Sequence, residues 1–334
     1  MFNKIYEKLK NFIIENYKFI VFLIFLAFFL NFKMDYVIYT PGGYISLNNR
    51  IEVEDGVDPL GSFNMAYVSM VYGTPATVLL SYFVPNWDIE KVEDITLDNQ
   101  SLEELEIYQK LSMRSSEDLA TVVAYKYAEE ELSNVYSNLN IMYLDQNSNT
   151  DLVVGDTIVE VNGVRSPTIN NILELLEGKE AGDEIKLTVL RDDKEVETTS
   201  VLFEKDDSVL IGISFVMTYD FDTEREISFK TKSGESGPSG GFMMTLAIYN
   251  QLVEEDLTNG KKIVGTGTID LFGNVGVIDG VKYKILGSTD ADIFFCPVEN
   301  YEEAIEVVDQ FDLDIEVVKV ETFYEAVEYL QNNK

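Results

Sequence analysis

The sequence predicts an α+β protein in which one N-terminal transmembrane helix precedes a folded domain that carries an inserted module. Three observations lead to this class. An uninterrupted apolar run, Phe19 to Leu30, lies near the N-terminus. The rest of the 334 residues mixes runs that alternate with a period of two, typical of antiparallel strands, with runs at helical spacing. Between about residues 131 and 205 the pattern becomes hairpin, helix and hairpin, which predicts a compact unit of its own.

The apolar run fits an uncleaved membrane anchor. Tyr17 to Met34 has the required length of about 20 residues if Lys18 and Lys33 extend toward the headgroups. No A-x-A cleavage site follows the run, which favours an anchor over a cleaved signal peptide, although a cleaved and freely secreted protein is the alternative. Lysines precede the run, so the positive-inside rule predicts that residues 1–16 are a cytoplasmic tail and that the rest of the chain lies outside the cell.

Strands followed by a long helix are expected from residue 36 to about residue 130. The segment YVIYTPGGYISL alternates with a period of two and is interrupted at Pro41-Gly42-Gly43, which predicts a turn. Helical spacing begins at TPATVLLSYF and recurs from about Ser101 to Glu131, with Ser101 as the N-cap before Glu104. From about residue 206 to residue 334, strands and helices alternate.

Composition excludes several kinds of chemistry. The chain has no His and a single Cys, Cys296, which excludes a Ser-His-Asp triad, a Cys-His dyad and a zinc site of His or thiolate ligands. A net charge of −34 argues against nucleic acid as a partner, because the phosphates would be repelled. No Gly-rich phosphate loop is present, so we expect no nucleotide, no other cofactor and no metal. Proton transfers in an enzyme of this composition must use carboxylates, Lys, Tyr or water.

The module resembles a bacterial PDZ domain. Its residues LVVGDTIVEVNG, Leu152 to Gly163, match the family pattern L-x-x-G-D-x-I-x-x-V-N-G, and a helix is expected from Thr168 to Leu176. PDZ domains bind an extended peptide by strand addition, so the resemblance implies a role in substrate recognition. It places the peptide-binding segment at Leu139, Asn140 and Ile141. That segment, SNLNI, lacks the usual glycine, and a spacer that binds no peptide is the alternative.

The sharpest chemical feature is Ser239, within SGESGPSGGFMMTLAIYN. It lies at the start of a helix that is apolar on all faces and is therefore expected to be buried. The backbone of the surrounding turn, at Gly237, Pro238 and Gly240, together with the positive end of the helix, could hold an oxyanion. Taken alone, this pattern also fits a serine that only caps the helix.

Ser239 and its surroundings resemble the G-P-S-[AG]-G motif of Lon-type (S16) serine proteases. The resemblance continues through IVGTGTIDLFGNVGVIDGVKYK, and it implies that Lys284 is the catalytic lysine and that Thr266 hydrogen-bonds it. Lys282 falls two positions early in the pattern and would point elsewhere on its helix. A lysine base must be neutral, and burial beside Ile285 is the expected cause of a lowered pKa.

YTPGGYISL, GSFNMAYVSM and the region around YQKLSMRSSEDLATVVAYKYA extend the resemblance to membrane-anchored, PDZ-containing Lon-like proteases of Gram-positive bacteria. It implies one Lon-type proteolytic domain built from residues 36–130 and 206–334, with the PDZ domain at 131–205 inserted between them. The implied function is that of an ATP-independent Ser-Lys endopeptidase that cleaves peptides or unfolded or secreted proteins outside the cytoplasm. The lack of a Walker motif agrees with ATP independence, and a Ser-Lys dyad fits a chain without His. A homo-oligomer is left open.

Two positions near the candidate dyad depart from the family pattern. Asp279 replaces the glycine usual before Gly280, and a carboxylate near Lys284 would raise the lysine pKa and weaken the base. Ser236 stands where the energy-dependent relatives carry Asp. Asp279 and the irregular PDZ segment keep open a catalytically weak or inactive PDZ adaptor or scaffold at the cell surface.

Overall fold

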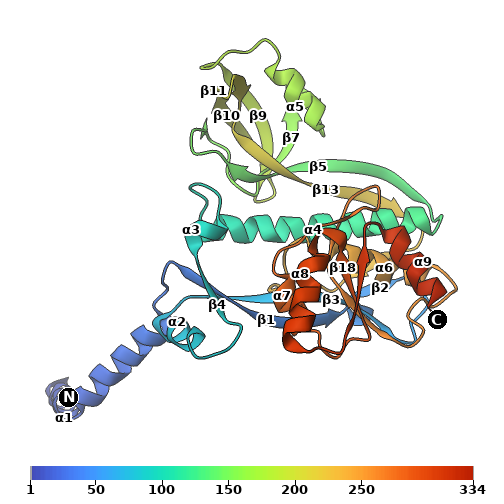
Figure 1. The fold of residues 1–334 in the computed structure, drawn as a ribbon. Coiled ribbons are helices and arrows are strands. Elements are labelled where there is room, and N and C mark those ends of the chain that lie inside the picture. The colour runs from blue at the N-terminus through green and yellow to red at the C-terminus, as the bar shows by residue number, and fades with distance from the viewer. Residues whose placement is uncertain (1, 334) are drawn as a thin grey trace. The chain divides into compact units, whose positions relative to one another are not determined.

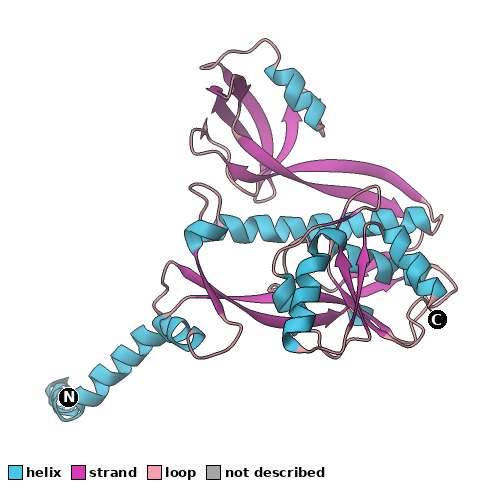
Figure 2. Cartoon of the chain, in the orientation of Figure 1, coloured by secondary structure: helices cyan, strands magenta, loops and turns pink. Residues whose placement is uncertain are grey.

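The computed structural model describes residues 2–333 and divides them into two compact units. The first unit comprises residues 2–40 and 69–95, and the second comprises 41–68 and 96–333. Both units mix helices and strands, which confirms the predicted α+β class (Figures 1 and 2). The division differs from the predicted domain boundaries, because two strands, β1 (Tyr36–Ser46) and β3 (Ser62–Tyr72), each run from one unit into the other.

Helix α1 (Phe2–Asn31) opens the first unit. Its stretch Lys4–Asn31 is long and apolar enough to cross a membrane, and its large apolar side chains are exposed. A bilayer would cover such side chains, so α1 is a candidate membrane span. The helix ends at Asn31, before the predicted end of the anchor at Met34.

The remainder of the first unit is small. Strand β4 pairs antiparallel with the first residues of β1, from Tyr36 opposite Lys91 to Tyr39 opposite Asp88. Helix α2 begins after Thr74, whose hydroxyl accepts from the Thr77 amide in a capping box. The bounds are α2 (Pro75–Ser81), β4 (Asp88–Lys91) and α3 (Val92–Ile95).

A largely parallel sheet forms the centre of the second unit, with the strand order β19-β18-β15-β3-β1. Strand β15 pairs parallel with β3 and with β18, and β18 pairs parallel with β19. The strands and helices that build this region are β15 (Lys262–Gly265), β18 (Ile293–Pro297), β19 (Glu316–Val320), α6 (Gly241–Leu252), α7 (Val281–Leu286), α8 (Tyr301–Phe311) and α9 (Phe323–Asn332). Shorter elements are β2 (Ile51–Val53), β14 (Ile227–Phe229), β16 (Thr268–Ile269), β17 (Val275–Gly276) and two 3-10 turns at Leu47–Asn49 and Val298–Asn300.

Helix α6 is the core helix of this region. Its residues Phe242, Met243 and Leu246 are fully buried and contact apolar side chains of the sheet, including Phe63 and Phe295. The prediction of a buried helix that is apolar on all faces is therefore confirmed. Because α6 begins at Gly241, two residues after Ser239, its packing in the core helps to position the serine turn.

The turn predicted at Pro41-Gly42-Gly43 is wrong, because these residues lie inside the continuous strand β1. A side chain at Gly42 would place its Cβ 2.3 Å from the Tyr67 carbonyl oxygen on β3. Glycine is needed here because the two backbones approach closely, not because the chain reverses direction.

The inserted module has its own seven-stranded sheet, with the order β13-β5-β7-β9-β10-β6 and with β8 beside β7. Its separate core includes Leu187 and Val189 of the sheet and Ile172 of helix α5. In the motif that the sequence singled out, buried Asp156 accepts hydrogen bonds from Arg191 at 2.6 and 2.7 Å. The bounds are β5 (Leu132–Leu144), β6 (Asn149–Thr150), β7 (Thr157–Val161), β8 (Val164–Arg165), α5 (Ile169–Leu176), β9 (Glu184–Arg191), β10 (Lys194–Val201), β11 (Phe203–Lys205), β12 (Ser208–Leu210) and β13 (Ile213–Thr223).

Strands β5 and β13 form one long antiparallel ribbon, which we call the arm of the module (Figure 1). The arm extends from Leu144 opposite Ile213 to Leu132 opposite Thr223, so the module's sheet continues well past the predicted boundary at residue 205. Helix α4 (Leu102–Tyr127) runs along the arm, and its Asp118 carboxylate accepts a 2.8 Å hydrogen bond from the Tyr219 amide of β13.

The predicted start of α4 is confirmed. Ser101 is its N-cap, and the Ser101 hydroxyl accepts from the Glu104 amide while the Glu104 carboxylate accepts from the Ser101 amide. This capping box satisfies backbone donors that the first turn would otherwise leave unpaired.

Candidate active site

Ser239 lies half-buried in the tight turn that leads into α6. The two glycines after it are required by close contacts. A Cβ at Gly240 would lie 2.7 Å from the Met65 sulfur, and a Cβ at Gly241 would lie 2.9 Å from Ile269 Cγ2. The Gly-Gly pair therefore lets the serine turn sit directly against β3 and β16.

The segment before Ser239 is held by helix α4 and by Arg50, the residue that precedes β2. The Gly237 amide, at φ +95°, donates to the Gln109 carbonyl at 2.9 Å, and Ser116 Oγ donates to the Pro238 carbonyl at 3.1 Å. Further upstream, Arg50 and Glu235 form a partly buried ion pair at 2.6 Å. Side chains and backbone far away in the sequence thus fix the loop that carries the serine.

The expected oxyanion donors need a correction at Gly237. Its N–H is already used by the Gln109 carbonyl, and Pro238 has no N–H to donate. The Ser239 and Gly240 amides are the other backbone donors of this turn. Ser236, three residues before Ser239, is exposed.

Lys284 is buried on helix α7, with 3% of its surface exposed. Its amine donates to Thr266 Oγ1 at 3.0 Å, and Thr266 Oγ1 in turn donates to the Ser239 carbonyl at 3.1 Å. The Gly267 amide donates to the same carbonyl at 2.8 Å. The structure therefore brings together Ser239, Thr266 and Lys284, three residues that are distant in the sequence.

The direction of these hydrogen bonds matters for chemistry. A hydroxyl has one proton to donate, and Thr266 gives it to the Ser239 carbonyl, so toward Lys284 it must accept. A neutral amine that donates one proton to Thr266 keeps its lone pair free for another proton. Within residues 2–333, the Lys284 amine and the Ser239 main chain are joined through Thr266, and no direct hydrogen bond links the amine to the Ser239 hydroxyl.

Helix α7 is positioned by glycines at both ends. Its N-cap, Gly280, has φ +70°, a left-handed conformation that suits glycine. At the other end, a Cβ at Gly287 would lie 2.5 Å from the Gly43 nitrogen, so the helix end contacts the β1 backbone directly. Glycine at position 287 thus allows the lysine helix to pack against this strand.

Burial lowers the pKa of Lys284 from 10.5 to about 8, while the charges of Asp279 and Cys296 oppose this to a smaller extent. The predicted effect of Asp279 is therefore present in direction but smaller than the effect of burial. Lys282 is half-buried on the same helix, with its amine 5.3 Å from the centre of the Tyr283 ring.

The other candidate groups differ from Lys284 in their surroundings. Burial raises the pKa of the Cys296 thiol to about 12, which makes it a poor nucleophile at neutral pH. Among residues 2–333, no group of three or more His, Cys, Asp or Glu side chains is arranged to hold a metal ion.

The expected peptide-binding role of Leu139, Asn140 and Ile141 is contradicted by their position. All three are buried in the middle of β5. Here β5 has strands on both sides, with Leu139 opposite Met217 of β13 and opposite Ile158 of β7. Strand addition requires an unpaired edge, and this segment has none to offer.

Sequence reasoning missed Gln109, Ser116 and Arg50, which hold the serine loop. A weak signal for Ser116 existed, because three serines, Ser112, Ser115 and Ser116, cluster within five residues of one amphipathic helix. The partner of these serines could not be inferred, since α4 and the Ser239 loop are separated by the whole module.

The fold and this constellation bring a serine, a buried lysine and a connecting threonine together in one domain, and lysine can take the place of histidine as the base in a serine peptidase. Comparison with known proteins points to the same class of domain. Residues 219–332 match the family model of the Lon protease (S16) C-terminal proteolytic domain, and this match indicates a serine protease.

Individual relatives point to the same domain. The chain is 32% identical to the Lon protease of Metamycoplasma arthritidis over 143 residues, which is 41% of this chain and 16% of that protein. It is 31% identical to the Lon protease of Ureaplasma parvum over 137 residues, 36% of this chain and 17% of the relative. The Lon protease of Campylobacter jejuni is 32% identical over 98 residues, 28% of this chain and 12% of the relative. The chain therefore spans less than a fifth of the length of these relatives.

Proposed function

We propose that this protein is an ATP-independent serine endopeptidase in which Ser239 is the nucleophile and Lys284 the general base. The observation that carries the proposal is the buried Lys284 amine, which has a pKa of about 8 and is joined to the Ser239 segment through Thr266. A base is most effective when its pKa is near the working pH, and a lysine of ordinary pKa would be almost fully protonated there.

The reaction follows from these positions. Neutral Lys284 accepts the proton of the Ser239 hydroxyl as the oxygen attacks the scissile carbonyl, and the resulting ammonium delivers a proton to the leaving amine. The Ser239 and Gly240 amides stabilise the oxyanion. Water activated by the same lysine then hydrolyses the acyl-enzyme. Thr266 is a positioning residue, because its hydroxyl orients the lysine amine without consuming the lone pair.

The same observation weighs against an inactive scaffold. Asp279 was one of the two features that favoured it, beside the irregular PDZ segment, but its charge opposes the lowered pKa of Lys284 less strongly than burial promotes it.

Cleavage of denatured casein by the full chain in detergent micelles tests the proposal. Ser239→Ala and Lys284→Ala should each abolish turnover, while Ser236→Ala and Lys282→Ala, which change the same residue types nearby, should retain it. Wild-type turnover in both Ser239→Ala and Lys284→Ala would refute the dyad. Loss of activity in Lys282→Ala with retention in Lys284→Ala would reassign the base. Since no step uses a metal, activity should survive EDTA.

We further propose that α1 anchors the protein in the cell membrane, with the N-terminus in the cytoplasm and the peptidase outside the cell, acting on peptides or unfolded or secreted proteins. The length and exposed apolar surface of α1 and the lysines at its start support this topology.

The topology can be tested by single-cysteine labelling in intact cells. Asp206→Cys, at an exposed turn of the module, should react with a membrane-impermeant maleimide, whereas Lys8→Cys should react only after lysis. The native Cys296 adds little background, because it is buried and its pKa is raised to about 12. Labelling of both variants, or of neither, before lysis would refute the orientation.

We also propose that the inserted module is PDZ-like and takes part in substrate recognition. The Asp156–Arg191 pair and the separate core support a self-contained module. Because Leu139 to Ile141 are paired on both edges, the recognition segment must be other than the predicted one.

A further inference from the structure

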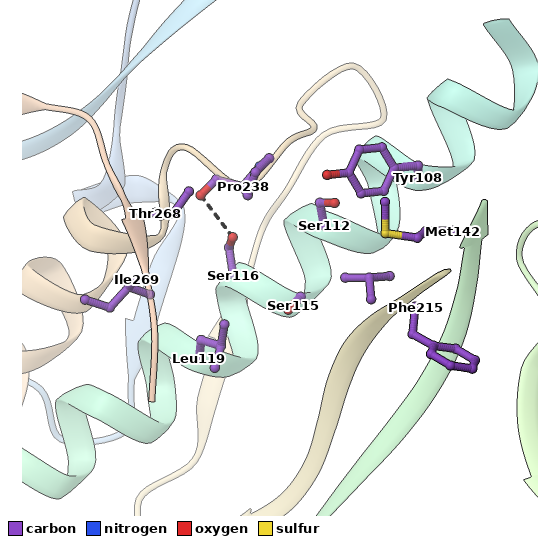
Figure 3. A pocket seen from close by; sticks show the side chains of 11 residues that line it. Tyr108, Ser112, Ser115, Ser116, Leu119, Met142, Phe215, Pro238, Thr268 and Ile269 are labelled. Carbon is purple, nitrogen blue, oxygen red and sulfur yellow. Dashed lines mark hydrogen bonds between the residues drawn. The ribbon is translucent and has the colours of Figure 1, made fainter. Parts of the chain in front are cut away.

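A cavity of about 230 Å³ lies beside the Ser239 turn (Figure 3). Three parts of the second unit enclose it: helix α4, the arm of the module, and the Pro238 and Thr268–Ile269 segments next to the candidate dyad. Pro238 directly precedes Ser239, and its carbonyl is held by Ser116 Oγ of α4. The cavity therefore opens beside the segment that carries the nucleophile.

Its lining is apolar with a few hydroxyl groups and contains no charged side chain. Tyr108, Leu119, Met142 and Ile269 supply apolar surface, and Ser112 and Ser115 add hydroxyl groups from α4. A charged side chain placed here would lose its hydration without gaining an ionic partner. Ligand pockets for drug-sized molecules or cofactors usually exceed about 300 Å³, so this cavity suits one amino-acid side chain instead.

The wall formed by Met142 comes from the inserted module. Figure 3 shows Met142 of β5 next to Tyr108 of α4, across the cavity from Pro238. The pairing of β5 with β13 shifts at this point, since Ser214 lies opposite Tyr143 while Phe215 lies opposite Ile141. Met142 is thus the extra residue of a β-bulge, and bulges redirect a side chain away from the regular alternation of a strand.

We infer that this cavity is a specificity pocket which takes a mid-sized apolar side chain, such as Leu or Met, from a residue close to the scissile bond, and that Met142 of the module arm limits its size. The inference rests on the proposed peptidase function. An extended substrate advances about 3.3 Å per residue, so a carbonyl at Ser239 brings the side chains of neighbouring residues to the mouth of the cavity. The module then contributes to substrate choice at the cleavage site itself.

Cleavage-site profiling with a proteome-derived peptide library tests the inference. The full chain in detergent micelles would be compared with Met142→Ala, Met142→Trp and the control Met217→Ala, which changes an exposed methionine of the same arm outside the cavity. Wild type should prefer Leu or Met at one position within two residues of the cleaved bond.

Met142→Trp fills the pocket and should lower kcat/KM for Leu and Met substrates by about 10-fold or more, with a shift toward Ala and Ser. Met142→Ala should shift the preference toward Phe, and Met217→Ala should match wild type. If Met142→Trp fails to fold, the Met142→Ala profile decides.

An unchanged preference in Met142→Ala, or an equal shift in Met217→Ala, with cleavage intact, would overturn the pocket assignment and leave the peptidase proposal standing. A wild-type chain that cleaves no peptide of the library would overturn the peptidase proposal and this inference with it.

Discussion

Replacing Lys284 by Met should stabilise the protein at neutral pH while abolishing its activity. Methionine has a similar length and no charge to bury. In the folded protein the Lys284 pKa is about 8, against an ordinary value of 10.5. At about 1.4 kcal/mol for each pH unit, this difference means that burial of the ammonium costs about 3 kcal/mol of folding free energy.

Lys284→Met removes this cost, but part of the stability gained is lost because the hydrogen bond to Thr266 is also removed. The Thr266 hydroxyl keeps its own bond to the Ser239 carbonyl and loses only the proton it accepts, which costs about 1 kcal/mol. The net expectation is that Lys284→Met raises the free energy of unfolding by about 2 kcal/mol at pH 7.

The sign of the pH dependence provides a second measurement. Below pH 8, Lys284 is protonated in both the folded and unfolded states, so its cost to the wild type is complete. Between about pH 8 and 10.5 the folded state has released the proton and the unfolded state still binds it. The free energy of unfolding of the wild type therefore rises with pH relative to that of the variant. The advantage of Lys284→Met should therefore disappear between pH 8 and 10.5, and near pH 10.5 the variant should be about 1 kcal/mol less stable than the wild type.

Urea unfolding of the full chain in micelles at pH 7, 9 and 10.5, followed by circular dichroism, would measure these differences. Lys282→Met is the matched control, because it removes a half-buried lysine from the same helix and should show no such dependence on pH. A Lys284→Met variant that is less stable than wild type at pH 7, or whose difference from wild type is constant with pH, would refute the assignment of a buried lysine with a lowered pKa.

Three further changes test the site and its support. Asp279→Asn removes a charge that raises the Lys284 pKa, so the alkaline rise of kcat should move to lower pH, and an unshifted pH–rate midpoint would contradict this. Glu235→Gln breaks the partly buried ion pair with Arg50, so it should lower the free energy of unfolding by about 1–3 kcal/mol in urea and lower kcat for casein. If neither value changed, the ion pair would not be what holds the serine loop. Phe242→Ala, at a fully buried position of α6, should cost about 3–5 kcal/mol in urea unfolding, and a loss below about 1 kcal/mol would rule out the described core.

Local signals in the sequence predicted local structure well. The Ser101 and Glu104 capping box and the apolar character of α6 both depend on interactions within a few residues, or on burial of every face of one helix. Lys284 and Thr266 were likewise brought within 3.0 Å of each other, as the family pattern implied. Their catalytic roles stay predictions.

The errors arose where a residue serves a distant partner. Gly42 looks like a turn residue in isolation, yet it is needed because Tyr67 of the neighbouring strand comes close. The Gly237 amide looked available for an oxyanion until its hydrogen bond to Gln109 was seen. Leu139 was placed at a binding edge because nothing in the sequence reveals that β13 pairs along β5. In each case the missing information was tertiary contact.

The ladder between β5 and β13 also determines how the module could be exchanged during evolution. The chain enters and leaves the module on adjacent, hydrogen-bonded strands, with Leu132 opposite Thr223 at the base of the arm. Topologically, the whole module is therefore the tip of one very long β-hairpin. Replacement or loss of the module would therefore leave the path of the chain through the rest of the domain unchanged. If the proposed substrate recognition by the module holds, recombination at this single site would change substrate preference without rebuilding the proposed peptidase domain.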